Sequence, residues 1–75
     1  MASESVKAEV TGKVWKVLIN VGDTVAEDDT ILIVESMKME IPIQAPCAGV
    51  VTDLHLAEGD AVTEGMVVAR IRRQS

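Results

Sequence analysis

Gly22-Asp23-Thr24-Val25 returns as Gly59-Asp60-Ala61-Val62, 37 positions further along the chain. The same shift, with no gap, aligns other glycine, valine and glutamate positions of the two halves. These matched pairs are Gly12 and Gly49, Val14 and Val51, and Glu27 and Glu64. Two copies are too few for a solenoid of stacked repeats. The repeat therefore predicts two similar half-structures related by a pseudo-two-fold axis.

The segments between the repeated turns have the pattern of short β-strands. Residues 6–10 alternate apolar and polar side chains, and Ile31–Val34 is a short, continuous apolar run. Turn-forming residues recur about every eight to twelve positions, which is typical of an all-β sandwich or barrel. The inward parity slips between Val14 and Val17, and again between Val51 and Leu54. A bulge or strand corner at the same place in each half explains both slips.

Composition restricts what the chain can do. Its 75 residues form one domain, residues 1–75, and the formal net charge is −5. An acidic surface disfavours nucleic acid, and no apolar run is long enough to span a membrane. A single cysteine excludes an internal disulfide, and a single histidine excludes a two-His metal site. We therefore expect no catalytic residues, no metal site and a cytoplasmic carrier or binding module.

The segment between the two halves, Glu35-Ser36-Met37-Lys38-Met39-Glu40, departs from ordinary turn chemistry. Strand-like residues flank it, so it should be a hairpin, yet its tip has no glycine, asparagine or aspartate to accept positive φ. Under the 37-residue shift Lys38 matches Ser75, the last residue. The tip should therefore lie at the opposite end of the domain from both termini. A lysine placed there is well positioned to present a covalently attached group.

A simpler interpretation is open on the residues alone. Met37 and Met39 could be ordinary core side chains and Lys38 an ordinary solvated charge. Among the other candidates, we expect His55 to have a surface or half-buried structural role and Cys47 to be a small buried thiol. Trp15 is expected to be partly buried, with its ring packed.

The motif Glu-Ser-Met-Lys-Met-Glu at residues 35–40 resembles the biotin-attachment site of biotin carboxyl carrier proteins, in which the lysine of Met-Lys-Met is biotinylated. The resemblance covers nearly the whole chain, including both Gly-Asp-x-Val segments. It implies a flattened β-barrel (a barrel-sandwich hybrid) of two four-stranded sheets, with covalent biotin on Lys38 flanked by Met37 and Met39. Ser36 stands where the family more often has alanine, and we expect no loss from it. Asp28 replaces the glycine that Gly65 supplies in the second half, and aspartate tolerates the left-handed region.

The resemblance implies a non-catalytic carrier component of a biotin-dependent carboxylase. Its expected partners are a biotin protein ligase, a biotin carboxylase and a carboxyltransferase, with biotin as a swinging arm that moves carboxylate between the last two. The isolated domain is expected to be monomeric. Acyl-CoA, pyruvate and urea systems share this carrier signature, so the acceptor stays open; an acyl-CoA is favoured, as in acetyl-CoA carboxylase and fatty acid biosynthesis. The alternatives are a lipoyl-type carrier, against which the two methionines argue, and an unmodified docking module.

Overall fold

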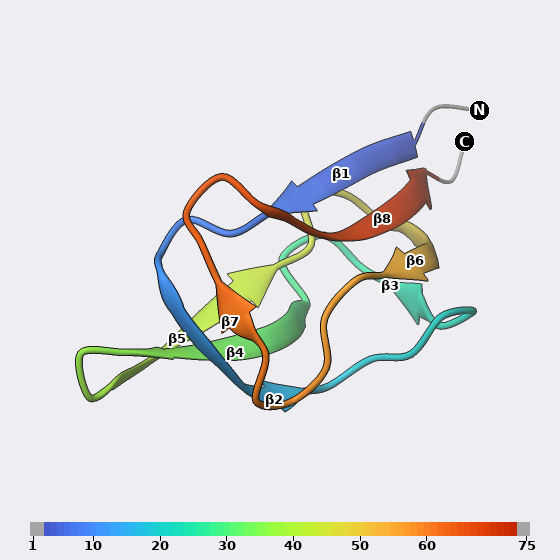
Figure 1. Cartoon of the computed structure of the whole chain (residues 1–75). Helices are drawn as coiled ribbons and strands as arrows, with labels where there is room; N and C mark the ends of the chain where they lie inside the picture. The colour runs from blue at the N-terminus through green and yellow to red at the C-terminus, as the bar shows by residue number, and fades with distance from the viewer. Residues whose placement is uncertain (1–2, 74–75) are drawn as a thin grey trace.

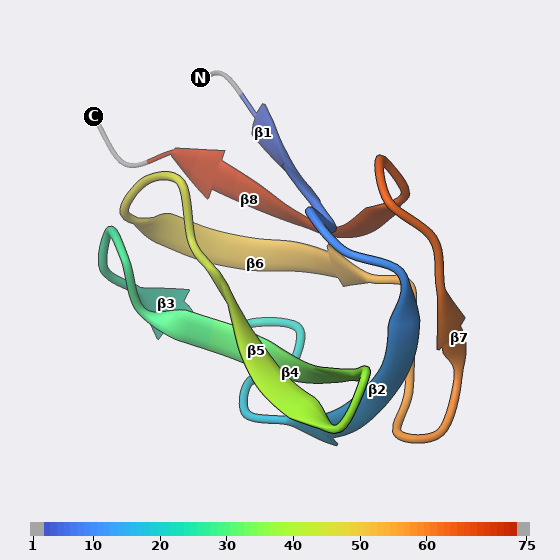
Figure 2. The same ribbon diagram turned by 90° about the vertical axis from the view of Figure 1, so that its left-hand side faces the viewer.

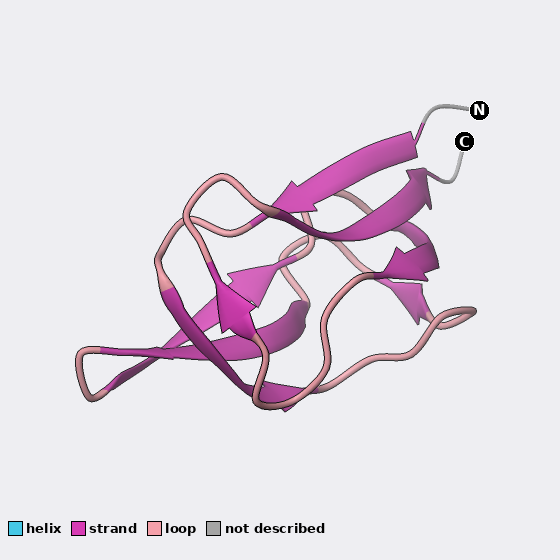
Figure 3. Ribbon diagram, in the orientation of Figure 1, coloured by secondary structure: helices cyan, strands magenta, loops and turns pink. Residues whose placement is uncertain are grey.

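The computed structural model describes residues 3–73 as two four-stranded antiparallel sheets packed face to face (Figures 1 and 2). The strands are β1 (Ser3–Lys7), β2 (Gly12–Val17), β3 (Thr24–Val25), β4 (Thr30–Ser36), β5 (Met39–Gln44), β6 (Gly49–Leu54), β7 (Ala61–Val62) and β8 (Val67–Arg73). One sheet has the order β1-β8-β6-β3 and the other β5-β4-β2-β7. Every described element is a strand or a loop, as Figure 3 shows. The all-β prediction is therefore confirmed.

The 37-residue repeat relates one sheet to the other. β2, β3 and β4 have the same bounds as β6, β7 and β8 after the shift, and β1 corresponds to β5. Backbone hydrogen bonds repeat as well: Gly22 N–H donates to Val51 O over 2.8 Å, and Gly59 N–H donates to Val14 O over 2.8 Å. Each half thus supplies the partners of the other half's turns, which makes the two halves mutually dependent.

The repeated Gly-Asp pair has a local reason. Gly22 and Gly59 have φ angles of 98° and 91°, a region in which a β-carbon would be strained. The carboxylates of Asp23 and Asp60 each accept a hydrogen bond from the backbone N–H three positions earlier, over 2.8 and 2.9 Å. Glycine permits the turn and aspartate closes it, so the same two residues recur in both halves.

The predicted slips in parity are β-bulges. The register of β2 on β4 shifts between Val14 and Lys16, and that of β6 on β8 shifts between Val51 and Asp53. Trp15 lies at the first bulge and is 48% exposed. It is more exposed than the sequence led us to expect, because the bulge takes its side chain out of the inward alternation.

The core between the sheets consists of aliphatic side chains and one buried cysteine. Ile31, Leu32, Val34, Val51 and Ile71 are fully buried, and residues from both sheets contribute to a single cluster. Cys47 is buried and His55 is exposed, as expected. No helix within residues 3–73 has the length and apolar character needed to cross a membrane.

Candidate functional site

The β4–β5 hairpin projects from the end of the barrel opposite the described chain ends, the start of β1 and the end of β8 (Figure 1). Ser36 pairs with Met39 across the hairpin, which leaves Met37 and Lys38 as a two-residue loop. Met37 is 92% exposed and Met39 64% exposed, and Lys38 is also exposed. The expectation placed the tip far from both termini; Met1 and Ser75 lie outside the described residues, and the tip lies far from the described ends at Ser3 and Arg73. The methionines are not core residues.

The backbone of this loop takes the conformation that its residue types disfavour. Met37 has a φ of 52° and Lys38 a φ of 66°. Two consecutive positive φ angles in a two-residue loop define a type I′ turn, whose usual residues are Asn-Gly. Asp28, with a φ of 73°, is the third residue other than glycine with positive φ in the described chain. The prediction that Asp28 fills the place of Gly65 is confirmed, since Gly65 has a φ of 87°.

Charged side chains flank the base of the hairpin. Glu35 and Glu40 are directly opposite each other in the β4–β5 ladder, and Lys13 of β2 is opposite Glu35 on its other side. All three are exposed. Like charges in facing positions repel each other, so Lys13 offsets part of the cost of the carboxylate pair. Sequence reasoning identified the two glutamates but not Lys13, which lies more than twenty positions away.

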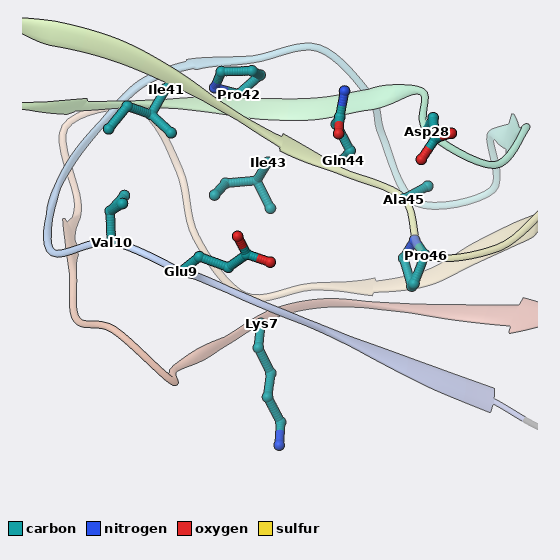
Figure 4. Close-up of a pocket in the computed structure, with 10 residues that line it drawn as sticks. All are labelled: Lys7, Glu9, Val10, Asp28, Ile41, Pro42, Ile43, Gln44, Ala45 and Pro46. Atoms are coloured by element: carbon teal, nitrogen blue, oxygen red, sulfur yellow. The ribbon is translucent and has the colours of Figure 1, made fainter.

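One cleft of the described chain lies away from the lysine hairpin tip. A cleft opens between the edge strands β1 and β5, and its lining residues include Glu9, Val10, Ile41 and Ile43 (Figure 4). Neither Lys38 nor its flanking methionines line it. Within the described chain, no three His, Cys, Asp or Glu side chains gather where they could hold a metal ion. The geometry at Lys38 suits a group that is tethered covalently and offered to other proteins.

The chain matches the family model described as "Biotin-requiring enzyme" over residues 1–71. The chain belongs to this family. It is 44% identical over 64 residues to a biotin carboxyl carrier protein of Streptococcus mutans, covering 85% of this chain and 49% of that one. It is 38% identical over 71 residues to the alpha3 subunit of a biotin-dependent acyl-coenzyme A carboxylase of Mycobacterium leprae. This match covers 95% of this chain and 12% of that subunit. The structure superposes on the crystal structure of the Kluyveromyces lactis urea carboxylase with a TM-score of 0.90 at 36% sequence identity. The superposition covers 96% of this chain and 6% of that one.

Membership explains the shortage of catalytic residues. The chain is a biotinyl carrier domain, and such domains are non-catalytic components of carboxylases, so the expectation that it is no enzyme by itself is confirmed. Lys38 is exposed at the tip of the projecting hairpin. Besides Lys13, sequence reasoning missed a hydrogen bond at the base of the hairpin: the Ser36 hydroxyl donates to the Thr11 carbonyl oxygen over 2.7 Å.

Proposed function

We propose that Lys38 is the residue that carries biotin, through an amide between its Nζ and the biotin carboxyl carbon. The observation that supports this most directly is the placement of Lys38 at the strained, fully projecting tip between two exposed methionines. An amine attacks a carboxyl carbon only after losing a proton and only when that carboxyl group carries a leaving group, so a ligase must supply both a base and an activated biotin carboxyl group. Amide formation then removes the positive charge from the tip.

The loaded carrier would accept carboxylate at a biotin carboxylase and release it at a carboxyltransferase. The carrier itself contributes effective concentration, because a tethered cofactor meets each active site as an intramolecular reactant. The exposed Met37 and Met39 side chains suit contact with more than one partner, since methionine is flexible and polarizable. For the acceptor we propose an acyl-CoA, which is supported by the similarity to the Mycobacterium leprae carboxylase subunit.

The intact mass tests the attachment site. The chain is expressed with biotin and lipoate available, beside Lys38→Ala and the control Lys13→Ala, which removes a nearby lysine from β2. A biotin-sized increment that is absent only from Lys38→Ala is the expected result. A lipoyl increment would identify the lipoyl alternative, and an increment retained by Lys38→Ala would place the biotin elsewhere.

The methionines should act in transfer more than in attachment. Met37→Ala and Met39→Ala are expected to leave biotinylation measurable and to slow carboxyl transfer, assayed with acetyl-CoA, propionyl-CoA, pyruvate and urea as acceptors. Transfer at the normal rate combined with lost biotinylation would contradict this division of roles. Carboxylation of urea or pyruvate alone would replace the acyl-CoA proposal.

We further propose that the domain is monomeric and works in the cytoplasm, in keeping with its single, buried Cys47.

A further inference from the structure

The type I′ turn at Met37 and Lys38 needs support from its surroundings. A residue other than glycine in the left-handed region costs on the order of 1 kcal/mol, and such conformations persist where neighbouring structure over-determines them. The turn projects into solvent, so the side chains of Met37 and Lys38 find little packing there. Support must therefore come from the base of the hairpin, where Ser36 pairs with Met39.

A side-chain bond ties this base to the barrel. The Ser36 hydroxyl donates to the Thr11 carbonyl oxygen over 2.7 Å, and the Thr11 hydroxyl oxygen accepts a bond from the Glu64 backbone N–H over 3.1 Å. Thr11 thus joins the end of β4 to the turn between β7 and β8. That turn is itself held, because Gly65 N–H donates to Ala8 O over 2.8 Å. The hairpin base, the β1–β2 loop and the β7–β8 turn form one connected unit.

The repeat provides an internal control for this unit. The positions that correspond to Thr11 and Ser36 in the second half are Ala48 and Arg73, neither of which has a hydroxyl group. The turn bond from Gly65 to Ala8, in contrast, has its counterpart from Asp28 to Ala45 over 2.9 Å. The barrel is thus built in the same way at both ends, and the hydroxyl pair is added only at the end that carries the lysine hairpin.

We propose that Ser36 and Thr11 are positioning residues that hold the Lys38 hairpin in its strained, projecting conformation for the biotin ligase. The inference rests on the proposed attachment of biotin to Lys38. Neither residue touches the reacting amine. They act by raising the fraction of molecules in which the tip is already ordered, so that a partner does not have to order it on binding.

Amide hydrogen exchange of the chain without biotin tests the anchor directly. Ser36→Ala should speed exchange of the amides of residues 36–39 about two- to five-fold, the effect of a hydrogen bond with a net strength of about 0.5 to 1 kcal/mol. Amides of β8 should be unchanged. Ser5→Ala is the matched control, because Ser5 is a strand serine of similar partial burial on β1. Ser36→Thr retains the hydroxyl and should restore slow exchange.

Ligase kinetics test the consequence. Ser36→Ala and Thr11→Val should raise the KM for the carrier about two- to five-fold and leave kcat unchanged, since the ordered tip is rarer but reacts normally once bound. Thr11→Ser keeps the hydroxyl acceptor for Glu64 and should behave like the unmodified sequence. A purely structural role would instead lower the melting temperature and leave the KM of the folded protein unchanged.

Four results would overturn the proposal: an unchanged KM in the folded Ser36→Ala variant, unchanged exchange at residues 36–39 in that variant, equal acceleration throughout β8, or failure of Ser36→Thr to restore the slow rate. A different result would contradict the proposal that Lys38 carries biotin. If the unmodified chain gains no biotin from the ligase, Lys38 is not the attachment site, whereas the exchange measurement on the unloaded chain still decides whether Ser36 anchors the hairpin.

Discussion

Replacing the Met37-Lys38 turn by Asn-Gly should stabilise the domain although it removes the proposed biotin attachment site. Both residues adopt positive φ, with angles of 52° and 66°. Asparagine and glycine are the residues that a type I′ turn favours at these two places. The side chains removed are exposed, with Met37 92% accessible, so little packing is lost with them. The gain in stability should therefore come from the backbone conformation alone.

The magnitude follows from two opposing terms. Relief of left-handed strain at two positions contributes about 1 kcal/mol each. Glycine at position 38 lowers the free energy of unfolding by about 0.4 to 1 kcal/mol, because it adds conformational freedom to the unfolded chain. The expected net stabilisation is about 1 kcal/mol. For a domain of this size that corresponds to a rise in melting temperature of about 4 to 8 °C.

The assay is thermal and urea unfolding of Met37→Asn/Lys38→Gly beside Met37→Ala/Lys38→Ala. The alanine pair removes the same side chains, including the charge near Glu35 and Glu40, but keeps a β-carbon at each strained position. Circular dichroism and the fluorescence of Trp15, the only tryptophan, report the transition. If the Asn-Gly variant melts at or below the temperature of the Ala-Ala variant, the tip is not strained and the reasoning fails.

Four further substitutions test the barrel by unfolding measurements. Gly49→Ala should destabilise by at least about 2 kcal/mol, because its β-carbon would overlap the backbone carbonyl oxygen of Arg72; a stable, fully folded variant would contradict that close approach. Val51→Ala should cost about 2 kcal/mol, since this side chain is fully buried, and a change under about 0.5 kcal/mol would argue against a tight core. Asp28→Gly should change stability by less than about 0.5 kcal/mol, whereas Gly65→Ala should cost about 1 kcal/mol; equal effects at the two positions would deny their equivalence.

Much of the candidate site could be predicted from local sequence. The sequence predicted short strands and both bulges, because strand periodicity and turn chemistry are properties of neighbouring residues. The bounds were less accurate, since the strand expected at residues 6–10 overlaps β1 (Ser3–Lys7) only at its end. The same symmetry placed Lys38 opposite the chain ends. The absence of glycine from the tip identified the turn as unusual, and the φ angles of Met37 and Lys38 show the strain that this absence implies.

Contacts between distant segments could not be predicted from the local sequence. The Ser36 bond to Thr11 joins residues 25 positions apart, and the Thr11 bond to Glu64 joins residues 53 apart. The local sequence gives Ser36 no role beyond a neutral replacement for alanine, whereas in the structure its hydroxyl bonds to Thr11 in the β1–β2 loop. Trp15 was expected to pack, and its exposure follows from the bulge geometry.

The amino-acid sequence by itself determined the all-β class and the two-fold repeat, and its resemblance to biotin carboxyl carrier proteins indicated the attachment lysine that we propose. The fold class depends on which φ angles each residue tolerates and on the period of its apolar neighbours, and both are local. Only the tertiary structure decided which strands pair, which charges face Glu35, and what holds the hairpin. Those features depend on how two sheets close around one core, bringing together groups whose separation along the chain carries no local signal.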